Sequence, residues 1–113
     1  MRQLLNGYPE MDALLVANDQ MALGVLQVAW RKGLDVPGDL AIVGFDGIPE
    51  SAYYWPPLTT VYQDQQKLGS TAVRELVRIV EASQQSETAV EPKTITLQSQ
   101  LIVRESSTAP KSV

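Results

Sequence analysis

The stretch VANDQMALG, residues 16–24, indicates how this chain folds, because an apolar run ends within it and a helical pattern begins. Asn18 and Asp19 stand at the junction. This order of residues predicts a strand-to-helix turn that presents an amide and a carboxylate. Ligands of open α/β sheets bind outside the carboxyl ends of the strands, so these side chains are placed to contact a small polar molecule.

A second strand end has the same design. The apolar run LAIVGF, residues 40–45, ends in Asp46 and Gly47. A continuous apolar run between two helix signals is typical of a parallel strand buried on both faces. Strand, helix and strand then form a right-handed crossover unit. Two strand ends with amide and carboxylate groups predict a binding site for a ligand rich in hydroxyl groups.

The composition limits the class of protein. Of the 113 residues, 44% are apolar and 19% are charged, as in ordinary globular domains, so we expect a single domain with a core of modest size. The sequence has no cysteine and no histidine. Because thiolate nucleophiles, the commonest metal ligand and the commonest general base are missing, we predict no catalytic residue, no metal site and no cofactor.

The charge and the apolar runs bear on partners and location. The net charge is -4, and the basic residues form no cluster. Binding to nucleic acid requires concentrated positive charge, so this stretch by itself is not expected to bind DNA or RNA. No apolar run is long enough to span a membrane, and the chain does not start with the pattern of an export signal. We expect a cytoplasmic protein that does not contact membranes.

The helical pattern over residues 20–32 has apolar positions on two stripes, so this helix needs cover on more than one side. Asp19 is the expected N-cap, and Gly33 is expected just after the last helical turn. Leu23, Leu26 and Trp30 are of the kind most often found in a core, yet the helix has more apolar surface than one sheet face can cover, so one stripe is available as a dimer surface. The stripes are Ala22, Leu23, Leu26, Ala29 and Trp30 on one side, and Met21, Val25 and Val28 on the other.

The remaining segments complete an α/β pattern. Strands and helices alternate, which predicts a partial doubly wound, mostly parallel sheet. The tail from residue 105 onward is expected to add nothing to the core. The other expected elements are the last turn of a helix at 4–8, strands at 12–17 and 58–62, a turn-rich segment at 47–57, a helix at 64–82, a polar loop at 83–92, and one or two strands within 94–104.

Four motifs follow one another along the chain. They are VANDQMALG at 16–24, a Gly-Leu-x-Val-Pro-x-Asp-Leu pattern at 33–40, AIVGFDG at 41–47 and PPLTTVYQD at 56–64. In this order and spacing they resemble the carboxyl-terminal part of the effector-binding core of LacI/GalR-type transcription regulators. The closing LIVRESS at 101–107 is similar to the last core strand of that family. The agreement of all four motifs is specific, whereas any one alone is weak.

The resemblance implies the carboxyl-terminal subdomain of a two-lobed, periplasmic-binding-protein-like type I fold. In that family a helix-turn-helix head precedes two lobes, and a small metabolite held between the lobes changes the affinity of the head for operator DNA. We expect residues 1–113 to form a single partial domain without a DNA-binding head. Residues 64–97 resemble a crossover into the other lobe, which is mostly absent. Operator DNA is then a partner only through an absent amino-terminal head.

The resemblance also assigns ligand-binding roles to three residues, and each has a plainer alternative. Asn18 faces the ligand in the family pattern, and its amide can donate and accept, or it merely caps the turn. Asp46 can accept hydrogen bonds from two adjacent hydroxyls, or it is only a turn-forming residue before Gly47. Gln63 matches a family position near the cleft and either binds a hydroxyl or lies in a hinge. The effector implied is a small molecule, with a sugar favoured.

Leu23 and Tyr54 match positions at which family members dimerise, so we expect a homodimer built around them. The aromatic neighbours Tyr53 and Trp55 can pack there or stack on a sugar. Two other functions are weighed against the regulator. A transport-associated sugar-binding protein has the same two-lobed fold, and a hydrolase could use the carboxylates of Asp19 and Asp46. The chain has no glycine fingerprint of a dinucleotide site, no P-loop and no Gly-x-Ser-x-Gly motif, so we expect a protein that is not an enzyme.

Overall fold

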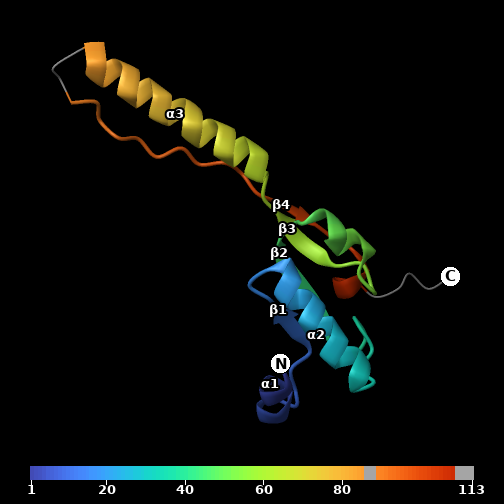
Figure 1. Ribbon diagram of the computed structural model, residues 1–113. Helices are drawn as coiled ribbons and strands as arrows, with labels where there is room; N and C mark the ends of the chain where they lie inside the picture. The colour runs from blue at the N-terminus through green and yellow to red at the C-terminus, as the bar shows by residue number, and fades with distance from the viewer. Residues whose placement is uncertain (86–88, 109–113) are drawn as a thin grey trace. The chain divides into compact units, whose positions relative to one another are not determined.

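The computed structural model describes residues 1–85 and 89–108, which form two compact units (Figure 1). The sheet unit comprises Met1–Gln63 together with residues 100–108. The helical unit comprises Asp64–Ser99.

The sheet unit is built on four strands in the order β1-β2-β3-β4. The first three are parallel, and β4 runs antiparallel to β3, which confirms the predicted mostly parallel α/β sheet. The register pairs Leu14 with Ile42, and Val43 with Thr59. The strands are β1 (Ala13–Leu15), β2 (Ala41–Asp46), β3 (Thr59–Tyr62) and β4 (Gln100–Ile102), with a short helix α1 (Arg2–Gly7) before β1.

Helix α2 (Asp19–Arg31) begins one residue before the predicted start and ends one residue early. Its N-cap is Asn18, whose Oδ1 accepts from the backbone N–H of Met21 at 2.8 Å. The prediction of Asp19 as the cap is therefore wrong. Asn18 has the extended backbone that a cap requires, and Asp19 is turned into the protein. Gly33 has a φ of +68°, which confirms its predicted place after the helix.

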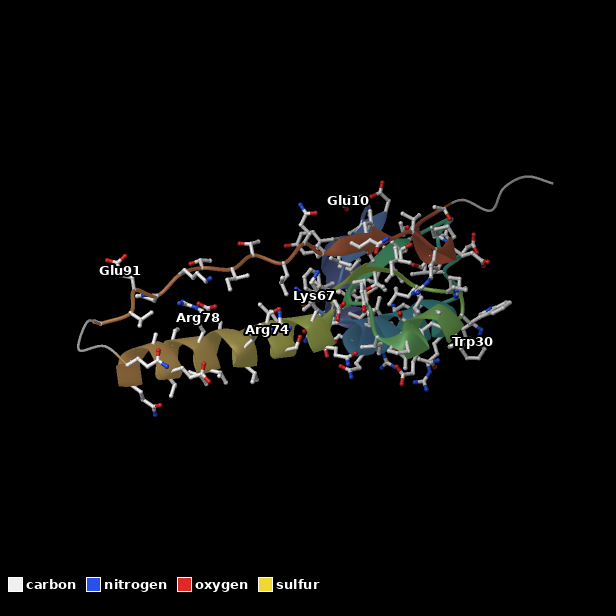
Figure 2. All side chains as sticks on the ribbon, turned by 90° about the horizontal axis from the view of Figure 1, so that it is seen from above. Glu10, Trp30, Lys67, Arg74, Arg78 and Glu91 are labelled. Carbon is white, nitrogen blue, oxygen red and sulfur yellow. The ribbon has the colours of Figure 1, made fainter. Side chains whose placement is uncertain are left out.

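The core lies between α2 and the sheet. The buried side of α2 takes residues from both predicted stripes, because only one side of the helix is covered by the sheet. The core interpretation is confirmed for Leu26, which is buried, and is wrong for Trp30 and Leu23, which are 74% and 40% exposed. Figure 2 shows the ring of Trp30 pointing outward. The core residues are Val16, Ala22, Val25, Leu26, Leu40, Ile42 and Leu58.

The carboxyl-terminal segment of the sheet unit is part of the packed structure. A single 3-10 turn, η2 (Glu105–Ser107), follows β4. Ser106 is fully buried, and its Oγ accepts from Thr59 N at 2.8 Å and donates to Ile42 O at 2.6 Å. The expectation that the tail adds nothing to the core is thus wrong up to this residue, because Ser106 ties two central strands together. Residues 109–113 of that tail lie outside the described residues.

The helical unit consists of α3 (Gln65–Gln85) and an extended segment that runs beside it (Figures 1 and 2). Asp64 precedes the helix, and its Oδ1 accepts from Lys67 N at 2.9 Å. An ion pair between Glu75 and Lys93, at 3.5 Å, joins the helix to the segment. Of the loop predicted at 83–92, residues 83–85 are helical and 86–88 lie outside the described residues.

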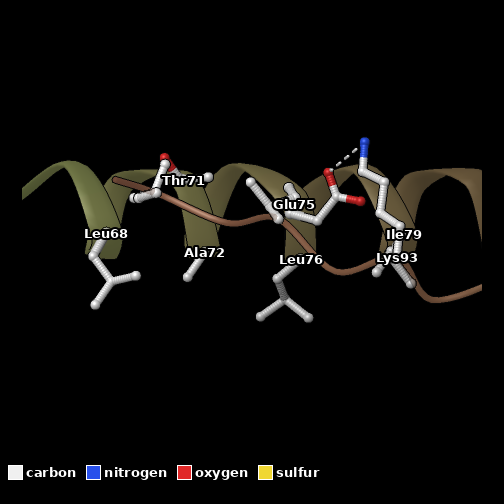
Figure 3. Close-up of a pocket in the computed structure, with 9 residues that line it drawn as sticks. Leu68, Thr71, Ala72, Glu75, Leu76, Ile79 and Lys93 are labelled. Carbon is white, nitrogen blue, oxygen red and sulfur yellow. Dashed lines mark ion pairs between the residues drawn. The ribbon is translucent and has the colours of Figure 1, made fainter. Parts of the chain in front are cut away.

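Apolar side chains of α3 are exposed to solvent in this unit. Leu68, Ala72 and Leu76 point to the same side of the helix and line a shallow cavity of about 310 Å³ (Figure 3). Leu76 is 61% exposed, and no residue of α3 is buried. The strand predicted within 94–104 forms only at its end, as β4. Among residues 1–85 and 89–108, no helix is both long and apolar enough to cross a membrane.

Candidate functional site at the strand ends

Three polar residues stand at the carboxyl ends of three neighbouring parallel strands. Asn18 follows β1, Asp46 ends β2 and Gln63 follows β3. Asp46 pairs in register with Tyr62, and the N–H of Gln63 donates to Asp46 O at 3.1 Å. Asn18, Asp46 and Gln63 are each partly buried. The structure therefore has all three predicted residues at one edge of the sheet, where ligands of open α/β sheets bind.

The chain turns sharply after β2, and the turn sets the direction of Asp46. Asp46 has a φ of +100° and Gly47 a φ of +72°, so two successive residues have left-handed backbone. Glycine is required at the second position, since a Cβ there would lie 2.7 Å from Tyr62 Cα. A non-glycine residue in this region costs about 1 to 3 kcal/mol and persists only where the surroundings fix it. The conformation of Asp46 is therefore imposed by tertiary contacts.

Those contacts come from Asp19 and Thr60, which are both fully buried. Thr60 Oγ1 donates to Asp19 Oδ1 at 2.6 Å and accepts from Gly47 N at 3.2 Å. The other carboxylate oxygen, Asp19 Oδ2, accepts from Ile48 N at 2.9 Å. Two successive amides of the turn are thus held by side chains from α2 and β3. Hydrogen bonds to a carboxylate are stronger than those between neutral groups.

Sequence reasoning missed these two residues. Asp19 was explained as a helix cap, and Thr60 was not singled out. Successive threonines inside a buried strand are the signal that could have found them, because buried hydroxyls need partners. Thr59 and Thr60 point to opposite faces of β3: Thr59 bonds to Ser106 and Arg104 of the closing segment, and Thr60 bonds to Asp19. The PPLTT and LIVRESS motifs are joined through Thr59.

The two predicted dimer residues lie in different settings. Leu23 is on the solvent side of α2. Tyr54 follows the 3-10 turn η1 (Pro49–Tyr53) and packs partly against the core. Burial raises the pKa of the Tyr54 phenol, and the nearby charges of Asp19 and Glu50 raise it further. The flanking aromatic residues Tyr53 and Trp55 are 88% and 86% exposed.

Polar groups in the described part of the chain are well satisfied. Within residues 1–85 and 89–108, each buried side-chain nitrogen or oxygen has a hydrogen-bond partner. The same residues contain no group of three or more acidic side chains placed to hold a metal ion. The chemistry at the strand ends is therefore that of hydrogen bonding by an amide, a carboxylate and a second amide.

A mostly parallel open sheet with polar residues at its strand ends is typical of a ligand-binding α/β domain. The comparison of the sequence with known families gives the same class of protein. Residues 1–107 match the periplasmic binding protein-like domain family, so the chain belongs to that family. The predicted resemblance to LacI/GalR-type regulators is confirmed by its relatives. The chain is 39% identical over 107 residues to the HTH-type transcriptional repressor PurR of Glaesserella parasuis, covering 94% of this chain and 32% of that protein.

Two solved structures of regulators are similar in fold. The transcriptional regulator CelR in complex with cellobiose superimposes with a TM-score of 0.85 at 35% identity, covering 94% of this chain and 31% of that one. The lac repressor dimer bound to operator and the anti-inducer ONPF gives a TM-score of 0.82 at 38% identity, covering 95% of this chain and 35% of that one. This chain spans about a third or less of the length of the curated relatives it matches.

Proposed function

We propose that the carboxyl ends of β1, β2 and β3 bind a small-molecule effector, and that in the whole protein this binding controls attachment to operator DNA. The observation that carries the proposal is the convergence of Asn18, Asp46 and Gln63 at one sheet edge, with Asp46 held in a fixed turn. The function is sensing rather than catalysis. An effector shifts the balance between two lobe arrangements only by its different affinity for each, typically about 1 to 3 kcal/mol.

A sugar is the favoured class of effector. The carboxylate of Asp46 can accept charge-assisted hydrogen bonds from two neighbouring hydroxyls. The cap of α2 uses only the oxygen of Asn18, so its amide nitrogen is the donor that a sugar oxygen needs. The similarity to a regulator solved with cellobiose supports this choice.

The rest of the regulator is proposed by analogy with the relatives of this chain. Operator DNA is contacted by an amino-terminal head that is not in this sequence, and such a protein works in the cytoplasm. The helical unit, with its open apolar side chains, belongs to the other lobe of the effector-binding core. The head, the cytoplasmic location and the second lobe are proposed for the whole protein, in which this chain forms the carboxyl-terminal part of the sensing core.

The same sheet unit is proposed to form a homodimer through Leu23 and Tyr54. Leu23 lies on the side of α2 that the sheet does not cover, and Trp30 extends this exposed surface. Burial of exposed aromatic and leucine side chains is the usual source of energy at the centre of an interface. The similarity to the lac repressor dimer supports the proposal.

The effector site can be tested in a chimera. The matched segment of the cellobiose-bound regulator is replaced by residues 1–107 of this chain, and cellobiose binding is measured by calorimetry. Asp46→Ala is expected to weaken binding by about 1.5 to 3 kcal/mol, because a charged partner is lost. That loss corresponds to about 10- to 150-fold in affinity. Asn18→Ala and Gln63→Ala are expected to weaken binding less.

Matched controls come from the same unit. Asp12→Ala removes an exposed carboxylate at the amino end of β1, the opposite edge of the sheet, and Asn6→Ala removes an exposed amide in α1. Both controls should bind cellobiose like the parent chimera. A folded chimera that binds no cellobiose, or one whose affinity is the same in all three site variants, would contradict the proposed site.

A further inference from the structure

The turn at Asp46 is fixed by a buried network that lies behind the strand ends. Asp19 receives one hydrogen bond from Thr60 on β3 and one from the amide of Ile48, just beyond the turn. The hydroxyl of Thr60 in turn accepts a hydrogen bond from the amide of Gly47. A third amide, that of Gln63, donates to the carbonyl of Asp46. The two peptide groups that follow the Asp46 side chain, Asp46–Gly47 and Gly47–Ile48, are therefore tied to α2, to β3 and to the residue after β3.

A buried carboxylate is costly unless its charge is compensated, and here each oxygen has a donor. Asp19 is also the first residue of α2, where the partial positive charge of the helix terminus favours an anion. Both carboxylate oxygens of Asp19 thus have donors, although the residue is fully buried. Asp19 holds the turn in place. It accepts a hydrogen bond from the amide of Ile48, and it also accepts one from Thr60, which in turn binds the amide of Gly47.

We propose that Asp19 and Thr60 are positioning residues of the effector site, which set the direction of the Asp46 carboxylate by holding the amides of Gly47 and Ile48. This inference rests on the proposed function. Neither residue touches the effector. Loss of the Thr60 hydroxyl leaves the Gly47 amide and one oxygen of Asp19 without their partner, so the strained turn relaxes and the carboxylate loses its fixed direction.

Thr59 gives a matched control on the neighbouring position. It is buried like Thr60, and its hydroxyl takes part in three hydrogen bonds against two for that of Thr60, but on the opposite face of β3 and to the closing segment. Thr59→Val and Thr60→Val therefore remove the same atoms from the same strand. Only Thr60→Val removes a support of the turn. Thr60→Ser keeps the hydroxyl and should behave like the parent protein.

The first arm of the test needs no ligand. Amide hydrogen exchange is followed by NMR in the 113-residue chain, with the core amide of Ile42 as the reference for global stability. Thr60→Val is expected to accelerate exchange at Ile48 and Gln63, which Thr60 does not itself bond, by about tenfold relative to Ile42. Thr60→Ser and Thr59→Val should leave that ratio unchanged. Equal acceleration in Thr59→Val and Thr60→Val would overturn the inference.

The second arm measures cellobiose affinity in the chimera. Thr60→Val is expected to lower affinity about tenfold, with recovery in Thr60→Ser. In an Asp46→Ala background, Thr60→Val should have no further effect, because a positioning residue acts only through the group it positions. Should Thr60→Val fail to fold by circular dichroism, Asp19→Asn replaces it, since an amide keeps the shape and removes the charge.

The outcomes separate this inference from the proposed function. Unchanged affinity in Asp46→Ala refutes the effector site itself, and the inference falls with it. A loss in Asp46→Ala with none in Thr60→Val overturns the inference alone. A Thr60→Val loss that persists undiminished in the Asp46→Ala background also overturns it, because the residue would then act by another route.

Discussion

Asp19 lies directly against the backbone of Gly44, so closely that a Cβ atom on Gly44 would overlap Oδ1 of Asp19. The same Cβ would also lie 2.8 Å from Cδ2 of Leu58. The glycine of the AIVGFDG motif therefore makes room for the buried carboxylate of the VANDQ motif. The two motifs are separate in the sequence, but their residues pack directly against each other in the fold.

The first prediction concerns this contact. Gly44→Ala is expected to lower the free energy of unfolding by about 2 to 4 kcal/mol, because the methyl group displaces Asp19 from its hydrogen bonds and crowds the core. Gly24→Ala is the control. A Cβ at Gly24 meets nothing within 4 Å, and the position is inside α2, so alanine should stabilise by about 0.5 to 1 kcal/mol. Urea denaturation measures both, and a neutral Gly44→Ala would refute the packing argument.

The second prediction separates the two roles of Asn18. Asn18→Ala should cost about 1 kcal/mol of stability, because the cap bond to Met21 N is lost. Asn18→Ser keeps a capping oxygen but has no amide nitrogen, so it should unfold like the parent chain while the chimera loses cellobiose affinity. Urea denaturation and calorimetry give the two readings. Parental affinity in Asn18→Ser would mean that Asn18 is a cap and not a ligand-binding residue.

The third prediction concerns pH. Burial, and then the charges of Asp19 and Glu50, raise the pKa of Tyr54, so the folded chain holds this proton to higher pH than the unfolded chain does. The associated stability is complete below about pH 10, the usual tyrosine value, and is lost as the pH rises through the folded-state pKa. Above about pH 10, the free energy of unfolding of the parent chain should therefore fall more steeply than that of the Tyr54→Phe variant.

Glu50→Gln provides the check on that cause. It removes one of the two charges, so the pKa of Tyr54 should move back toward its usual value without reaching it, because burial is the largest cause. Denaturation at pH values from about 8 to about 11, around the usual tyrosine pKa, measures the difference. Parallel stability curves for the parent and Tyr54→Phe would show that the phenol is not perturbed by the fold.

The fourth prediction concerns assembly. The chain is expected to sediment as a dimer, and Leu23→Arg should make it monomeric, because a charge cannot be buried unpaired at the centre of an interface. Tyr54→Asp should have the same effect when added to it. Met21→Arg is the control, since Met21 is 57% exposed on another side of α2. A monomeric parent chain, or a Leu23→Arg chain that remains dimeric, would exclude this interface.

Local patterns in the sequence determined the elements and their order. The helix from Asp19 to Arg31 and the glycine that follows it were predicted within one residue, because capping and periodicity depend on neighbours along the chain. The three polar strand ends were found for a similar reason: a parallel sheet gathers its carboxyl ends at one edge whatever the details of packing.

Only the tertiary structure decided what is buried and what holds the site. Trp30 has the spacing of a core residue and is exposed, because burial depends on whether another element covers that side of the helix. Asp19 has the place of a cap, and the fold instead uses it to hold a turn 29 residues away in the sequence. Contacts between residues far apart in the sequence depend on how the strands and the helix pack in space. A local sequence pattern does not contain that information.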